Sequence, residues 1–263
     1  MDLGLKGKVA LVAAASQGLG RAVAEELAAE GALLILCARH DEALQATCTA
    51  IEQAHGTPVL GLATDVADPA AVARLVAAGL ARFGRIDILV TNAGGPPAGI
   101  FATLDAAQWE AATRLLLTSV VELTRAVLPG MQARGWGRIL NITSISVKQP
   151  VANLMLSNSL RAAVTGMART LATEVAAQGI TVNNILPGYT RTERVVGLAE
   201  VTAAREGISA AEATARWEQE IPMRRLGEPR EFAALAAFLC SERASYITGT
   251  SVPVDGGWIR GLL

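Results

Sequence analysis

The residues of this chain that could carry out proton chemistry gather in the stretch SISVKQPVANLMLSNSLRAAV, residues 144–164. The stretch holds hydroxyls, amides, one lysine and one arginine, but no His, Tyr, Asp, Glu or Cys. Leu156, Leu160 and Val164 form an apolar stripe at the spacing of a helix. Ser157 and Arg161 stand four residues apart beside that stripe, so both side chains point the same way. The pattern predicts a helix that presents a hydroxyl and a cation together.

A glycine-containing turn follows the first predicted strand, in the sequence AAASQGLGR. Gly18 and Gly20 let the backbone approach a pyrophosphate, and the helix that begins there directs its free N–H groups and positive dipole end toward it. Many strand-to-helix turns contain glycine for packing alone. Because this turn opens a chain of βαβ units, dinucleotide binding is the favoured interpretation.

The second predicted strand ends with Ala38 and Arg39 and carries no acidic residue there. An acidic residue at this position would hold the ribose hydroxyls of NAD, whereas a basic one can pair with the 2′-phosphate of NADP. The strand end therefore favours NADP(H). The alternative is that Arg39 is an ordinary surface cation.

Short apolar runs alternate with Ala-rich stretches of helical periodicity along the whole chain. Continuously apolar strands separated by helices are typical of a parallel sheet covered on both faces. We therefore predict an α/β fold, a single domain over residues 1–263 with one Rossmann-type doubly wound sheet of about seven strands. Residues 191–225 are polar and Ala-rich, and are expected to form a small helical lid outside the sheet. The strands are expected at 8–13, 33–38, 58–63, 86–91, 137–143, 180–186 and 250–254.

Composition narrows the classes of function. Of the 263 residues 51% are hydrophobic, and the net charge of −1 gives no electrostatic footprint for nucleic acid or an anionic membrane. The apolar runs are too interrupted to span a bilayer. Three separated cysteines without a CxxC pair suit a reducing compartment, so a cytoplasmic protein is expected. The two histidines are too isolated to predict a metal site.

Further motifs follow in order along the chain: TDVAD (64–68), TNAG (91–94), LPGM (128–131), GRILNITS (137–144), GITVNNILPG (179–188) and VDGG (254–257). Together with the glycine turn they resemble the short-chain dehydrogenase/reductase family, in particular its 3-oxoacyl-carrier-protein reductases. The resemblance implies an NADP(H)-dependent oxidoreductase acting on a carbonyl/alcohol pair of ketone or 3-oxoacyl type. It also implies a homotetramer or homodimer.

The resemblance assigns cofactor contacts to particular residues. The adenine would be flanked by Asp65 and Val66, and the ribose and central strands supported by the segment 92–94. The nicotinamide end would be lined by residues that follow the sixth strand, and Arg161 could hold ribose hydroxyls. The expected cofactor-binding set is Ala14, Ser16, Gly18, Leu19, Gly20, Arg39, Asp65, Val66, Asn92, Ala93, Gly94, Arg161, Pro187, Gly188 and Thr192.

The chain departs from the family in its glycine turn. The family usually opens this turn with Thr-Gly, and here Ala13 and Ala14 occupy those positions. An alanine is tolerable at the second of them if its backbone φ is negative. The replacement therefore weakens the prediction of cofactor binding only slightly.

The catalytic set departs further. The family uses an Asn, a Ser, and a Tyr and Lys four residues apart; alignment places Leu116, Ser144, Ser157 and Arg161 at these positions. Ser144 alone matches, and Leu116 falls in an apolar stripe that indicates core packing. We take Ser144, Ser157 and Arg161 as the catalytic candidates.

These replacements change what the site can do. A Ser hydroxyl is far less acidic than a phenol, and an arginine keeps its charge but does not deprotonate. Ser144 could still donate to a carbonyl oxygen. Two functions stay open: an oxidoreductase with a non-standard catalytic set, and a catalytically impaired cofactor-binding homologue that acts as a sensor or partner subunit. We favour the enzyme, because the cofactor of this fold is itself the reagent.

Other residues could replace the missing acid or recognise substrate. Lys148 lies in the loop after Ser144 and is either a proton donor or a solvated surface charge. Tyr189 follows the LPG motif and is either an acid or an aromatic lining the pocket. Arg191 and Arg194 could attract an acidic substrate or a carrier-protein phosphate, or be ordinary exposed cations.

The C-terminus ends in VDGGWIRGLL. Apolar residues at an exposed tail are expected to be buried against another subunit. The residues concerned are Trp258, Leu262 and Leu263.

Overall fold

The computed structural model describes residues 2–262, and in these residues seven parallel strands form one sheet in the order β3-β2-β1-β4-β5-β6-β7. The predicted fold is thereby confirmed, and each strand begins and ends within two residues of its expected bounds. From β1 the strands are added outward to β3 on one side, and from β4 outward to β7 on the other. The strand order therefore reverses between β1 and β4, the point at which such folds bind ligands. The strands are β1 Val9–Ala13, β2 Leu33–Ala38, β3 Val59–Ala63, β4 Ile88–Thr91, β5 Gly137–Ile142, β6 Ile180–Pro187 and β7 Ser251–Val254.

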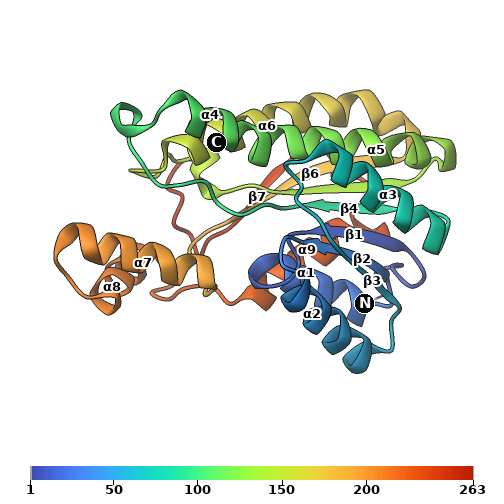
Figure 1. Ribbon diagram of the computed structural model, residues 1–263, viewed down its shortest axis with the longest axis horizontal. Helices are drawn as coiled ribbons and strands as arrows, with labels where there is room; N and C mark the ends of the chain where they lie inside the picture. The colour runs from blue at the N-terminus through green and yellow to red at the C-terminus, as the bar shows by residue number, and fades with distance from the viewer. Residues whose placement is uncertain (1, 263) are drawn as a thin grey trace.

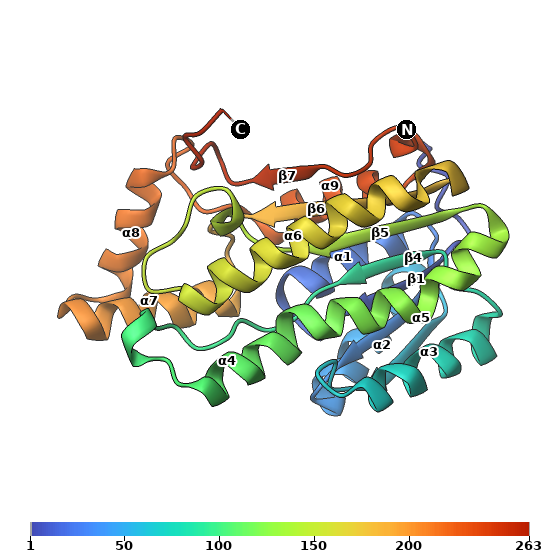
Figure 2. The same cartoon turned by 90° about the horizontal axis from the view of Figure 1, so that it is seen from above.

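Helices cover both faces of the sheet (Figure 1). One face carries α1 (Gly18–Ala29), α2 (Asp41–His55) and α9 (Pro229–Leu239), and the other carries α3 (Pro69–Phe83), α5 (Ser119–Arg134) and α6 (Met155–Val175). Figure 2 shows α5 and α6 crossing the second face, with α4 (Ala106–Thr113) continuing into α5. Within residues 2–262 no helix has both the length and the apolarity needed to cross a membrane.

The alternation of side chains along β1 divides the core into two layers. All five residues of this strand are buried. Ala10 and Val12 pack into the apolar cluster under α1 and α9, whereas Val9, Leu11 and Ala13 pack into the cluster under α3, α5 and α6. Successive side chains of a strand point to opposite faces, so a strand covered on both sides must be apolar throughout.

Two helices lie outside the sheet, in the segment where a lid is expected. They are α7 (Glu193–Glu206) and α8 (Ala210–Glu220), which pack against each other and project to one side of the molecule (Figure 1). Ser209 begins α8 with a capping box, because its hydroxyl accepts from the backbone N–H of Glu212 and the Glu212 carboxylate accepts in return. The role of this segment as a lid stays a prediction.

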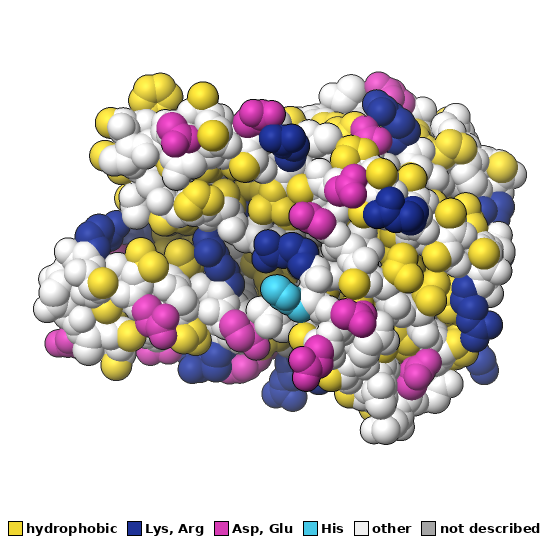
Figure 3. Space-filling model, in the orientation of Figure 1, with side chains coloured by type: hydrophobic (Ala, Val, Ile, Leu, Met, Phe, Trp, Pro, Cys, Tyr) yellow, Lys and Arg dark blue, Asp and Glu magenta, His cyan; other side chains and the backbone are white. Residues whose placement is uncertain are grey.

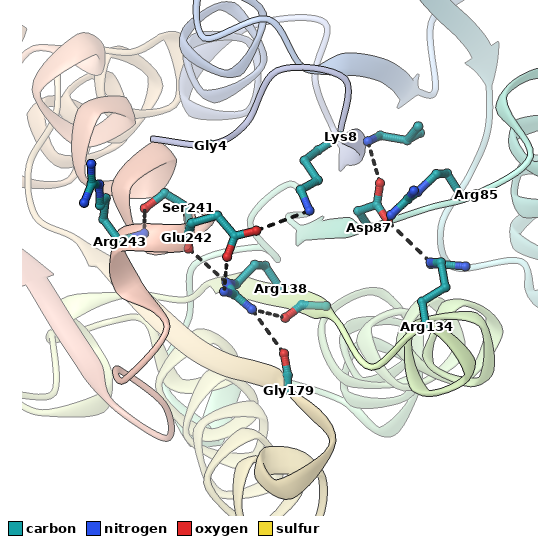
Figure 4. A network of polar contacts seen from close by, with 12 residues as sticks. Gly4, Lys8, Arg85, Asp87, Arg134, Arg138, Gly179, Ser241, Glu242 and Arg243 are labelled. Atoms are coloured by element: carbon teal, nitrogen blue, oxygen red, sulfur yellow. Dashed lines mark hydrogen bonds and ion pairs between the residues drawn. The ribbon is translucent and has the colours of Figure 1, made fainter. Parts of the chain in front are cut away.

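Buried charges join the strands at their amino-terminal ends, the edge opposite to the carboxyl ends where ligands bind (Figure 4). Asp87, which is fully buried, accepts hydrogen bonds from the backbone N–H of Val9 at 3.0 Å and from Nε of Arg85 at 2.8 Å. Nε of Arg134 lies 3.5 Å from the same carboxylate. Asp87 therefore links β1, β4 and the end of α5.

The C-terminal tail differs from its expectation at Trp258. This side chain is only 9% exposed and packs within its own chain against Leu186, Ile221 and Leu226. The expected burial against another subunit is therefore wrong for Trp258, because the subunit itself covers the ring. Leu262 is fully exposed, and Leu263 lies outside the described residues. Assembly as a homodimer or homotetramer stays a prediction.

Candidate active site

A pocket of about 540 Å³ opens at the carboxyl ends of the central strands. Figure 3 shows it as a hollow with an apolar floor and basic side chains at its rim. Every expected site residue except Gly20 lines this pocket. They are Ala14, Ser16, Gly18, Leu19, Arg39, Asp65, Val66, Asn92, Ala93, Gly94, Ser144, Ser157, Arg161, Pro187, Gly188 and Thr192.

The turn between β1 and α1 has the form that a pyrophosphate needs. The Gln17 side chain makes no capping hydrogen bond, so the first N–H groups of α1 have no side-chain cap. Gly18 has a φ of +57°, which favours glycine. Gly20 lies beneath the turn, where a Cβ would collide with the carbonyl oxygen of Ala14. The two glycines thus shape the turn in different ways.

Ala14 does not meet the condition under which alanine is tolerated freely in this turn. Its φ is +50° rather than negative, so an L-residue occupies the left-handed region at the position where the family usually has glycine. The neighbouring Asn92 side chain reaches its carbonyl oxygen at 3.5 Å. Ala14 thus adopts a backbone conformation that glycine adopts freely, at a cost of about 1–2 kcal/mol.

We expect Ala14→Gly to raise the free energy of unfolding. Relief of the left-handed strain outweighs the added entropy of the unfolded chain, leaving a net gain of about 0.5–1 kcal/mol. Urea denaturation followed by tryptophan fluorescence measures the change. The control is Ala22→Gly within α1, which should destabilise the protein by about 1 kcal/mol. A loss of stability in Ala14→Gly would contradict the strain.

The second strand places a cation at one end of the pocket. Arg39 is exposed, follows the buried end of β2 and lines the pocket. Its Nη2 lies 3.9 Å from where a Cβ of Gly94 would stand, so the side chain leans toward the loop after β4. Arg39 forms no ion pair with any of residues 2–262. Its guanidinium is free to pair with a phosphate.

The three catalytic candidates line the same pocket. Ser144 follows β5, and its Oγ accepts from the backbone N–H of Ser146 at 3.1 Å, which leaves the hydroxyl proton available for donation. Ser157 and Arg161 reach the same pocket from α6. Arg161 donates from Nη1 to the carbonyl oxygen of Ile142 at 2.9 Å. Two hydroxyls and one guanidinium therefore surround a shared space.

Comparison with known proteins identifies the family. A family model described as enoyl-(acyl carrier protein) reductase matches residues 13–259. Dehydrogenase/reductase SDR family member 4 of Oryctolagus cuniculus is 37% identical over 254 residues, covering 96% of this chain and 94% of that protein. The 3-oxoacyl-(acyl-carrier-protein) reductase FabG of Escherichia coli (strain K12) is 36% identical over 255 residues, covering 97% and 98%. The chain belongs to the short-chain dehydrogenase/reductase family.

A solved structure supports the same assignment. L-sorbose reductase from Gluconobacter frateurii, complexed with NADPH and L-sorbose, aligns with a TM-score of 0.95 and 36% identity over 100% of both chains. The predicted family and the predicted class of enzyme, an oxidoreductase of the short-chain dehydrogenase/reductase type, are thereby confirmed. The roles of the replaced residues stay predictions.

Leu116, the residue expected at the position of the family's Asn, lies in an irregular part of the backbone. Leu116 lies in a π-helical turn, Arg114–Thr118, that joins α4 to α5, and such turns are frequent at functional sites. The side chain is 3% exposed and packs against Leu156 and Leu160 of α6, as its apolar stripe predicts. A second cavity, of about 10 Å³, lies between Leu116 and Arg161.

Neither alternative acid takes the place of the family's tyrosine. Tyr189 lines the pocket but stacks on Trp217, with ring centroids 4.8 Å apart, and meets Trp258 edge-on at 6.0 Å. Burial, and then the charge of Glu220, raise the pKa of Tyr189 to about 12, which makes it a poor proton donor near neutral pH. Lys148 is exposed and does not line the pocket.

The pocket also contains residues that the sequence did not single out. His40 and Thr143 extend the ends of β2 and β5, and their places directly after expected strands were an available signal. Glu193 and Leu198 come from α7. Their contact with the pocket depends on how α7 folds back, which no local pattern indicates.

Proposed function

We propose that this enzyme uses NADPH to reduce the carbonyl group of a small molecule, or NADP⁺ to oxidise the corresponding alcohol, with a non-standard catalytic set. The observation that carries the proposal is that one pocket is lined both by the glycine turn and Arg39 and by Ser144, Ser157 and Arg161. Its relatives include a 3-oxoacyl reductase and an L-sorbose reductase solved with NADPH.

The residues present fit this cofactor. Gly20 lets the helix pack directly beneath the turn, and the uncapped start of α1 would offer N–H groups to the pyrophosphate. Arg39 would pair with the 2′-phosphate, and Arg161 would hold ribose hydroxyls. When bound, NADPH supplies a hydride. The remaining contacts would come from Ala14, Ser16, Gly18, Leu19, Asp65, Val66, Asn92, Ala93, Gly94, Pro187, Gly188 and Thr192.

The chain's own residues would stabilise the charge that develops on the substrate oxygen as the carbonyl carbon accepts a hydride. The hydroxyls of Ser144 and Ser157 donate hydrogen bonds to that oxygen, and the positive charge of Arg161 stabilises it. Water then supplies the proton, because neither Ser nor Arg readily releases one. Proton transfer from a positioned acid contributes about 100- to 10,000-fold in rate, so turnover should be slow.

A catalytically impaired homologue that acts as a sensor or partner subunit is the second candidate. It is favoured by the state of the two alternative acids, since Tyr189 has a raised pKa and Lys148 does not line the pocket. This candidate predicts cofactor binding without product. The two functions therefore differ in a direct measurement.

The test is NADPH oxidation by the purified protein against ketones, ketoses and 3-oxoacyl thioesters, with the alcohol product identified by mass spectrometry. The proposed enzyme converts a subset of these compounds slowly and forms one alcohol for each NADPH consumed. Binding of NADPH without any product from the whole panel would contradict the proposed reduction.

We expect Arg39→Ala to lower the affinity for NADPH by about tenfold to a hundredfold, because a charge-assisted contact to the 2′-phosphate is lost. NADH affinity should barely change. Titration of each reduced cofactor by fluorescence measures both, and Arg230→Ala, an exposed cation of α9 away from the pocket, is the control. This role would be contradicted if the native protein bound NADPH and NADH equally well and Arg39→Ala changed neither affinity.

A further inference from the structure

Two arginines at the reacting end of the pocket share it without an acidic partner. Arg161 comes from α6 and Arg194 from α7, and both line the pocket. Each donates only to a backbone carbonyl: Nη1 of Arg161 to Ile142 at 2.9 Å, and Nη2 of Arg194 to Pro96 at 3.3 Å. Neither guanidinium forms an ion pair in the described part of the chain, residues 2–262.

The two charges are close enough to affect each other. Burial, and then the positive charge of Arg194, lower the pKa of Arg161 to about 10. Burial also lowers the pKa of Arg194. Two like charges in a partly desolvated site repel, and an anion bound between them removes the repulsion.

The loop after β4 leaves room for the guanidinium of Arg194. A Cβ at Gly95 would stand 2.6 Å from Cζ and 2.8 Å from Nε of this arginine, so any larger residue at position 95 would displace it. Glycine here lets Arg194 lie against the loop and reach into the pocket. The position of the second cation is therefore built into the fold.

The acidic residues that line the pocket face elsewhere. Asp65 accepts from the backbone N–H of Ala67 at the end where the adenine is expected. The Oε2 atom of Glu193 stands 3.5 Å from where a Cβ of Gly18 would be, which places it over the glycine turn. The paired guanidinium groups of Arg161 and Arg194 therefore keep their net positive charge.

We propose that Arg161 and Arg194 bind the carboxylate of the substrate, so that the preferred substrate is an oxo acid or hydroxy acid rather than a neutral ketone. This inference rests on the proposed function, and it names the substrate class of the same site. Guanidinium groups are suited to carboxylates because they offer several N–H donors in a planar fork. The phosphates of the cofactor have other proposed partners, namely the uncapped start of α1 and Arg39.

Binding to the protein loaded with NADP⁺ tests the inference without turnover, because a ketone cannot be reduced by the oxidised cofactor. The probes are 2-oxobutanoate, 3-oxobutanoate and 4-oxopentanoate, each compared with its methyl ester by calorimetry. At least one acid should bind about tenfold or more tightly than its ester. Arg194→Gln should remove that preference and leave the affinity for NADP⁺ unchanged.

The matched control is Arg191→Gln, which removes a charge three residues away that pairs with Glu228 and does not line the pocket. It should keep the preference for the acid. Equal binding of every acid and its ester, or a preference that survives Arg194→Gln, would overturn the inference. The inference would also be overturned if the native protein showed no preference for the acids and Arg194→Gln lost affinity for NADP⁺. In that case the two arginines would bind the cofactor. Acid-specific binding in a protein that reduces nothing would support the anion site and contradict only the proposed reduction.

Discussion

Replacing Ser157→Tyr and Arg161→Lys together should raise the rate of carbonyl reduction by about 100-fold or more. The double variant restores a phenol whose pKa a neighbouring cation lowers toward neutrality, and positioned proton transfer contributes about 100- to 10,000-fold. Both side chains line the same pocket from α6, one turn apart, so the new pair would face the space where the substrate is expected. The measurement is kcat for a ketone that the native protein converts slowly.

The matched control is Ser157→Phe with Arg161→Lys, which fills the same space without a hydroxyl. It should not raise the rate. If both double variants gave the same increase, filling of the pocket rather than proton transfer would be responsible, and the assignment of α6 as the catalytic helix would be wrong.

Leu116 should limit the gain in the double variant. The cavity of about 10 Å³ between Leu116 and Arg161 is close to the space that one water needs. Asn92 and Thr143 also line this cavity, but the Leu116 side chain offers such a water no hydrogen-bond partner. Adding Leu116→Asn to the double variant supplies an amide in the π-helical turn. The expected result is a further increase in kcat, provided that the protein remains folded by circular dichroism.

Asp87→Ala should lower the free energy of unfolding by about 1.5–3 kcal/mol, because it removes a charged acceptor and leaves the buried N–H of Val9 without a partner. Arg85 and the backbone N–H of Val9 lose their acceptor at a site where the carboxylate is fully buried. Urea denaturation followed by tryptophan fluorescence measures the loss. The cofactor pocket lies at the opposite edge of the sheet, so NADPH affinity at low temperature should be kept by the folded fraction.

Two controls separate charge from contact. Asp87→Asn keeps hydrogen-bonding atoms and should cost less, at most about 1.5 kcal/mol. Glu25→Ala breaks an exposed pair with Arg21 and should cost at most about 1 kcal/mol. A loss below about 1 kcal/mol in Asp87→Ala would show that the buried network contributes little net stability.

The sequence predicted the fold because its strands are apolar on both faces and separated by helices. That pattern is set by burial of each strand between two helical layers, as β1 illustrates with its alternating residues. The pocket was predictable for a related reason: in a parallel sheet the residues that follow each strand meet at one edge. Arg39 and Ser144, far apart in sequence, reach the pocket in this way.

Three features could not be predicted from the sequence, because they depend on backbone strain or on contacts from distant elements. The positive φ of Ala14 is imposed by the surrounding turn, not by alanine's own preference. Trp258 packs against Ile221 and Leu226 of the same chain. These residues follow α7 and α8, and no local sequence pattern indicates that this segment returns to the C-terminal tail. Arg194 could not be distinguished from a surface cation until Gly95 and Pro96 were placed beside it.

Ser144 provides the most direct test of the account, since it is the one residue expected to match a member of the family's catalytic set. Single-turnover reduction of a ketone by the NADPH-loaded protein is compared with that of Ser144→Ala, and NADPH affinity is measured for both. The account predicts slow reduction that Ser144→Ala lowers by about 100-fold or more, with cofactor affinity unchanged, because a hydrogen-bond donor to the developing oxyanion is removed. Fast reduction that Ser144→Ala leaves intact would contradict the account and place the chemistry elsewhere in the pocket.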